Sequence, residues 1–220
     1  MYAPCITNII QHNTTYIQHI TITTQCTHNT LQRQHKKHKK EKAMKKASIT
    51  ILLIITFFIL LILQENVFRN FTIAGIMPNL FVIFILFIGL YGNSGLSISF
   101  GVICGVMIDL LYSKTVGVTA IMLCIIGYLG AYFDKNFSKE NKMMIIIMVA
   151  AATILFEIGY YGINSILLGY EPEIWRFVKI LTIEVLYNIL LTILLYPLIQ
   201  KAGYSMDRAF KKDNILTRYF

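Results

Sequence analysis

From residue 47 onward, the chain consists of long apolar runs separated by short polar breaks. A helix needs about 20 predominantly apolar residues to cross the hydrocarbon core of a bilayer, and fewer where the membrane thins. The pattern therefore predicts an all-α membrane protein with a bundle of six transmembrane helices over residues 44–200. The predicted spans are Ala47–Leu63, Met77–Tyr91, Leu96–Leu111, Val116–Phe133, Met143–Leu168 and Phe177–Ile199.

The polar breaks set the boundaries of the first three spans. A short apolar run after two lysines also fits a signal peptide, but no small-residue cleavage pattern follows at 64–68, so we interpret it as a retained anchor. Pro78 is tolerated in the first turn of the second helix. The break at 92–95 (Gly-Asn-Ser-Gly) separates the second run from the third. Both runs are short, which predicts a pair of tight or tilted helices.

The distribution of Lys and Arg supports this count. With the N-terminus inside, the inner segments from Met44 onward hold ten Lys and Arg and the outer segments hold four. Merging the second and third spans into one would give the inner and outer segments equal numbers of Lys and Arg. The positive-inside rule therefore favours six spans with both termini in the cytoplasm of a bacterial inner membrane. Residues 201–220 then form a basic cytoplasmic tail suited to anionic lipid.

Composition agrees with a lipid environment. Apolar residues make up 56% of the chain and charged residues 14%, against about 45–50% and about 25% in soluble domains. The net charge of +9 is concentrated at the start, because residues 1–46 hold eight Lys and Arg against one acid. Residues 47–220 hold twelve Lys and Arg against ten Asp and Glu. The basic character therefore belongs to a terminal segment, and we expect no nucleic-acid partner.

The first 43 residues differ from everything that follows. They contain no Gly, hold all five His residues and show no persistent apolar periodicity, which favours disorder. Because Met44-Lys45-Lys46 before an apolar run is typical of the start of a bacterial membrane protein, we interpret residues 1–43 as a leader that is not native sequence. The alternative is a disordered cytoplasmic arm whose lysine run at 36–40 contacts anionic lipid.

Small residues recur at helical spacing in the third and fourth spans. Ser97, Gly101 and Gly105 share one face of the third span, and Gly127 belongs to a similar stripe on the fourth. In lipid, small residues allow two helix backbones to approach closely. These four positions are therefore predicted to pack helices.

Ionisable side chains inside a membrane cost at least about 2.5–3.5 kcal/mol each near its centre. The topology places three acids in the outer half of the bilayer, and polar residues at helical spacing accompany two of them. We predict an intramembrane polar seam between the fifth and sixth spans, reached by the acid of the third span. Three interpretations are open: hydrogen bonding between helices, a pathway for a ligand or a proton, or acids that lie at a wet edge of the bundle. The seam residues are Asp109, Glu157, Tyr161, Asn164, Glu184 and Asn188.

Recognisable catalytic motifs are missing from the apolar part of the sequence. No His occurs in residues 47–220, so neither a Ser–His pair nor an HExxH zinc motif can form there. The sequence contains no Walker-type phosphate loop, and its four Cys residues show no metal-binding spacing. We therefore expect no enzyme, no catalytic residue, no cofactor and no metal.

From Met44 onward the sequence resembles the rod shape-determining protein MreD family. The resemblance covers roughly 170 residues and rests on the order and spacing of several short motifs. Asn79 departs from the family, which often has Asp at this position, although Asn also caps helices. The motifs are Pro78-Asn79-Leu80, Gly89, Gly92, Gly95, Gly101, Gly105, Asp109, Gly117, Gly127-Tyr128, Glu184 to Asn188 and Tyr196-Pro197.

The resemblance implies a non-enzymatic scaffold of the bacterial elongation machinery, which maintains cell shape during sidewall peptidoglycan synthesis. The implied partners are an MreC-like bitopic membrane protein and, indirectly, an MreB-like filament, a SEDS glycosyltransferase and a penicillin-binding transpeptidase. The implied fold is similar to the substrate-binding membrane subunits of energy-coupling-factor transporters. We expect the small-residue face of Gly101 and Gly105 to receive a partner's transmembrane helix.

That fold similarity leaves a second interpretation open. A six-span protein with a polar seam in its outer half is also suited to capture a vitamin or a metal ion for a transporter. The outer loops, however, are short and poor in polar residues that would contact a ligand.

Overall fold

A computed structural model describes residues 33–34, 36–37, 39–113, 115–136, 141–169 and 173–210. The chain divides into two units, residues 1–48 and 49–220. In the first unit, all of the described residues are helical. That residues 1–43 form a disordered leader stays a prediction, and most of that segment lies outside the described residues.

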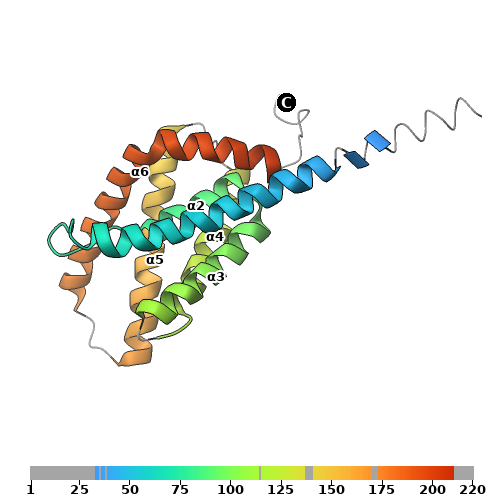
Figure 1. Ribbon diagram of the computed structural model, residues 1–220. Coiled ribbons are helices and arrows are strands. Elements are labelled where there is room, and N and C mark those ends of the chain that lie inside the picture. Colours follow the sequence, from blue (N-terminus) through green and yellow to red (C-terminus); the bar gives the residue numbers. More distant parts are fainter. Residues whose placement is uncertain are drawn as a thin grey trace, which may run out of the picture. The chain divides into compact units, whose positions relative to one another are not determined.

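The described residues from 39 onward form six apolar helices and no strand, which confirms the predicted all-α membrane bundle (Figure 1). The first helix runs from Lys39 to Phe68 and ends in a π-helical segment, η1 (Leu63–Phe68). The helices that follow are α2 (Leu80–Tyr91), α3 (Ser94–Tyr112), α4 (Val118–Asn136), α5 (Lys142–Leu168) and α6 (Ile174–Phe210).

Helix α2 is shorter than predicted and forms the centre of the second unit. Its 12 residues extend about 18 Å at 1.5 Å per residue, well short of the roughly 30 Å hydrocarbon core. The other five helices described here are long and apolar enough to cross a membrane. Every α2 residue except Phe84 is buried. A helix that is apolar on all sides is suited to such a central position.

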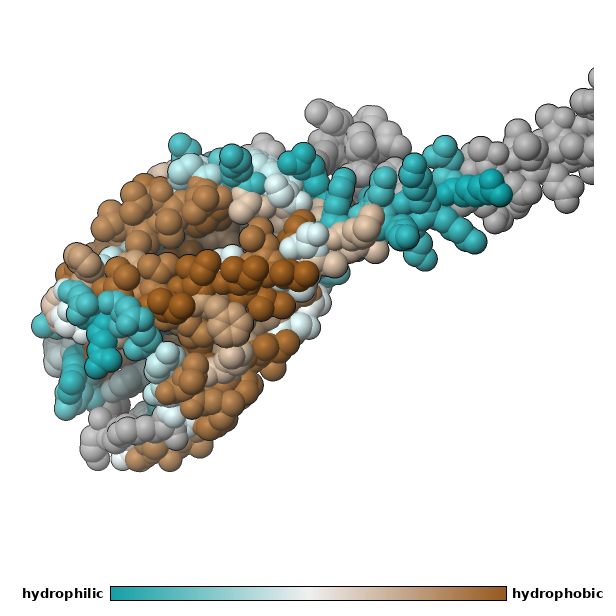
Figure 2. Space-filling view, viewed as in Figure 1, coloured by the Kyte–Doolittle hydropathy of each residue, from teal (hydrophilic) through white to brown (hydrophobic). Residues whose placement is uncertain are grey.

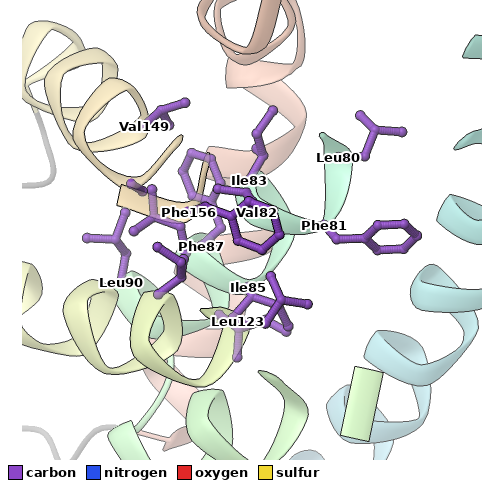
Figure 3. Packing of buried hydrophobic residues seen from close by; sticks show 14 of the residues in the cluster. Leu80, Phe81, Val82, Ile83, Ile85, Phe87, Leu90, Leu123, Val149 and Phe156 are labelled. Carbon is purple, nitrogen blue, oxygen red and sulfur yellow. The ribbon is translucent and has the colours of Figure 1, made fainter. Parts of the chain in front are cut away.

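The core forms where neighbouring helices surround α2. Leu123 of α4 and Val149 and Phe156 of α5 belong to the same cluster of buried side chains as Val82 and Ile85 of α2 (Figure 3). All five of these side chains are buried. Burying a large aliphatic or aromatic side chain in a close-packed core gains many dispersion contacts, which must hold the helices together in lipid because the lipid is itself apolar.

The outer surface of the second unit carries the opposite pattern to that of a soluble domain. Large apolar side chains are exposed along the helices, among them Phe58, Ile147, Leu190 and Leu194. Figure 2 shows hydrophobic residues over much of the visible face of this unit. Continuous apolar surface of this extent is typical of contact with lipid acyl chains.

The small residues of α3 and α4 bring these two helices into backbone contact. A Cβ atom at Gly105 would lie 2.3 Å from the Cα atom of Ala120, and one at Gly101 would lie 2.6 Å from the carbonyl oxygen of Leu123. The Ser97 hydroxyl donates to the carbonyl oxygen of Gly127 at 3.0 Å. The face of Gly101 and Gly105 is therefore covered by α4, and the expectation that it receives a partner's helix is wrong.

Helix α6 continues beyond the predicted boundary at residue 200. Its 37 residues amount to about 55 Å of helix, and it bends along its length (Figure 1). Pro197, a residue type that kinks helices, lies inside it. Gly203, Met206 and Ala209 are buried beyond it. Residues 201–210 therefore belong to the bundle, and the rest of the predicted tail lies outside the described residues.

Candidate functional site

Asp109 lies at the end of α3 and caps the beginning of α4. Its carboxylate accepts hydrogen bonds from the backbone N–H groups of Gly117 at 2.8 Å, Thr119 at 3.1 Å and Ala120 at 3.3 Å. The residue is fully buried. A carboxylate at a helix N-terminus satisfies N–H groups that lack a partner within the helix and interacts favourably with the helix dipole. Asp109 thereby joins two helices.

Asn188, on α6, connects three elements. Its side-chain oxygen accepts a hydrogen bond from the backbone N–H of Asn79 at 2.9 Å, and its amide donates to the Thr153 hydroxyl on α5 at 3.0 Å. Thr153 in turn donates to the carbonyl oxygen of Val149 at 2.9 Å. Asn188 and Thr153 have no exposed surface. The amide therefore holds α5 and α6 to the residue that caps α2.

Glu157 on α5 and Glu184 on α6 both belong to the predicted polar seam. The side chains of Glu157 and Glu184 lie close enough to interact with each other, and the Asn79 side chain lies close to Glu184. Glu184 is 6% exposed. The α5–α6 contact thus brings together one buried carboxyl group, that of Glu184, and one half-buried carboxyl group, that of Glu157.

The two remaining seam residues make separate contacts closer to the end of α5. The Asn164 side chain donates to the carbonyl oxygen of Tyr160 at 2.9 Å and accepts from the Thr115 hydroxyl. The Tyr161 ring stacks on Phe177 of α6 with 4.4 Å between ring centroids. The structure therefore brings Glu157 and Glu184 together and places Asn188 on Asn79, which lies beside Glu184. Asp109, Asn164 and Tyr161 have other hydrogen-bond or ring partners.

A cavity of about 430 Å³ adjoins the carboxyl pair. It is lined by the end of the first helix, the 75–79 segment, the ends of α3 and α4 that Asp109 joins, and one face each of α5 and α6. Buried Pro78 and Glu184 form part of its wall, whereas Gly75, Met77 and Tyr112 at its edge are exposed. In the predicted topology, all of these segments lie on the outer side of the membrane.

Three residues that contribute to this region were not among the predicted seam residues. Gln64 donates to the carbonyl oxygen of Pro78 at 2.7 Å and fixes the 75–79 segment to the first helix. Asn79 caps α2 by accepting from the backbone N–H of Val82 at 3.3 Å. Thr153 precedes Glu157 by one helical turn, and this spacing was the available signal. For Gln64, the only signal was a polar residue at the end of an apolar run.

Together, these features define the class of protein to which the chain belongs. Apolar helices long enough to span a bilayer enclose polar groups that hydrogen-bond across helices, as expected where no water is available to satisfy them. The chain is a multi-pass α-helical membrane protein.

Comparison with known families gives a narrower assignment. The family model described as rod shape-determining protein MreD matches residues 45–202. The chain belongs to the MreD family, which confirms the resemblance seen in the sequence and indicates a rod shape-determining membrane protein. No curated protein and no solved structure matches the chain. The similarity to substrate-binding subunits of energy-coupling-factor transporters therefore stays a prediction.

Proposed function

We propose that this chain is a non-enzymatic scaffold subunit of the bacterial cell-elongation machinery, maintaining cell shape during sidewall peptidoglycan synthesis. The observation that carries the proposal is the MreD family match, which covers residues 45–202. Proteins of this family determine cell shape without enzymatic activity and work with MreC and the shape-determination machinery.

The use of buried polar residues in the bundle supports a scaffold. Asp109 and Asn188 have hydrogen-bond partners on neighbouring elements, and these contacts hold α3 to α4 and α5 to α6. A general acid or base needs a group within reach of a substrate. Both side chains are instead occupied in contacts that fix the relative positions of helices, which is what a rigid docking platform requires.

The direct partner in this proposal is an MreC-like bitopic membrane protein. An MreB-like filament, a SEDS glycosyltransferase and a penicillin-binding transpeptidase are reached through it. The protein spans the cytoplasmic membrane with both termini in the cytoplasm, as the excess of Lys and Arg in the inner segments favours. Because α4 covers the face of Gly101 and Gly105, the partner contacts another surface of the bundle.

Co-purification tests the partner directly. A tagged copy of the full chain, extracted in mild detergent, is expected to retain the MreC-like protein encoded in the same genome. A matched polytopic membrane protein with the same tag should retain none. Absence of the MreC-like protein from the tagged complex, with the chain folded and monodisperse, would contradict the proposal.

A further inference from the structure

We propose that the cavity beside Glu157 and Glu184 binds an organic cation, namely an ammonium group carried on an apolar chain. This inference goes beyond the scaffold function and does not depend on it. It rests on the charge of the cavity, its size and the character of its walls.

The charge of the cavity is one-sided. Three carboxyl groups line it, those of Glu65, Glu157 and Glu184, and the described residues along its wall include no Lys, Arg or His. Acids within membranes are normally paired with an opposite charge, because isolated charge is costly there. Here Glu157 and Glu184 have each other as neighbours, and Glu184 also lies close to the neutral Asn79 side chain. A cation entering the cavity would supply the missing charge.

The size of the cavity favours an organic molecule over a bare metal ion. About 430 Å³ falls within the roughly 300–1,000 Å³ of small-molecule sites. Among the described residues, no group of three or more His, Cys, Asp or Glu is placed to hold a metal ion. A small metal ion would leave most of this volume unfilled.

The walls provide the rest of the recognition. Phe156 and Tyr160 both line the cavity, and their rings stack with 5.8 Å between centroids. Aromatic faces attract ammonium groups, by about 2 kcal/mol or more where water is excluded. Met77, Ile108 and Ile180 add apolar surface for the carrier chain. Carboxyl groups beside an aromatic and aliphatic wall are the chemistry that selects an alkylammonium ion.

A matched series of ligands tests the proposal. The full chain is placed in nanodiscs of phosphatidylglycerol in an amine-free potassium phosphate buffer, and binding is followed by calorimetry and by the unfolding temperature. Butylammonium is expected to bind saturably, whereas 1-butanol, which has the same carbon chain without the charge, is not. Equal binding of both compounds would overturn the proposal.

Variants locate the site. The double variant Glu157→Gln with Glu184→Gln keeps hydrogen-bonding capacity and volume but removes the charge, and its affinity should fall at least roughly tenfold. Glu173→Gln alters an acid of an exposed ion pair that is not part of the cavity wall and should bind as the parent does. If the double variant folds and binds butylammonium as tightly as the parent, the proposal is wrong.

If the double variant does not fold, Ile180→Trp tests the same site, because it fills the cavity and leaves both carboxyl groups in place. Loss of butylammonium binding supports the proposal, and unchanged binding overturns it.

A second set of nanodiscs containing phosphatidylethanolamine distinguishes the source of the ammonium group. Weaker butylammonium binding there supports the site and assigns a lipid headgroup to it. Unchanged affinity, with binding still dependent on Glu157 and Glu184, supports the site and assigns a free amine.

Discussion

At the scale of single residues, the bundle depends on polar side chains that each satisfy several backbone or side-chain groups. Asp109 accepts three backbone hydrogen bonds and Asn188 links residues of two other elements. In a bilayer, a group that loses such a partner finds no water to replace it, so the cost of removing one side chain is the cost of leaving several groups unsatisfied.

Asp109→Ala should therefore lower the free energy of unfolding by about 1–3 kcal/mol, because it leaves the first N–H groups of α4 without an acceptor. Chemical unfolding in detergent micelles measures this change. Glu173→Ala is the control, since its carboxylate belongs to an exposed ion pair 3.8 Å from Arg176 that contributes little. Equal stability of the two variants would contradict the capping role.

Asn188→Ala should cost a similar amount, about 1–3 kcal/mol, because both the Asn79 N–H and the Thr153 hydroxyl lose a partner. Leu190→Ala, on the same helix but 59% exposed, should change stability much less. The comparison uses the same unfolding assay. If Leu190→Ala were the more damaging of the two, hydrogen bonding through Asn188 would not be what holds α5 and α6.

At the scale of helices, close backbone contact between α3 and α4 is set by glycine. Gly105 allows α3 to approach Ala120 of α4 so closely that an added methyl group would overlap its Cα atom. The contact lies within the molecule, so a change at Gly105 acts on folding before it acts on any partner.

Gly105→Ala should thus reduce stability by about 1–3 kcal/mol through overpacking and lower the yield of monodisperse protein. Gly95→Ala, at a helical position where a Cβ atom meets nothing within 4 Å, should be neutral or slightly stabilising because Ala favours helices over Gly. Size-exclusion profiles and unfolding curves of the two variants provide the test. A fully stable Gly105→Ala variant would show that the two backbones do not touch.

The last turns of α6 are held by a second glycine contact. A Cβ atom at Gly203 would lie 2.6 Å from the Tyr91 ring at the end of α2, so Gly203→Ala should loosen residues 201–210. Gly162→Ala, where a Cβ atom meets nothing within 4 Å, is the control. Faster hydrogen exchange in residues 201–210 of the first variant only is the expected result. Unchanged exchange in both variants would mean that this segment does not depend on α2.

At the scale of the whole molecule, the sequence predicted six apolar helices and a polar seam between the fifth and the sixth, because hydropathy and helical spacing are local properties. It did not predict that α2 would begin only at Leu80 and be enclosed by other helices. An apolar run has the same sequence pattern whether it contacts lipid or protein. The partner of Asp109 depends on how the connection to α4 folds back, and the packing of α6 beyond residue 200 depends on Tyr91, so neither is encoded in local spacing.

The depth of α6 in the bilayer can be checked with the single Trp residue of the chain. Trp175 is 89% exposed in the first turn of α6, and the predicted topology places it at the outer membrane–water interface, where Trp is enriched. Its fluorescence should be quenched more strongly by lipids brominated near the headgroup than by lipids brominated near the chain end. The reverse order would place this turn at another depth and contradict the predicted span.

The shape-determining role of the intact protein is tested most directly by depletion in its own host. Cells that lose the chain should change from rods to spheres while still growing, and a copy of the full chain should restore the rod shape. Glu173→Ala should restore it equally well, whereas a variant that does not fold, such as a strongly destabilised Gly105 substitution, should not. Depleted cells that keep their rod shape and width would contradict the proposed function.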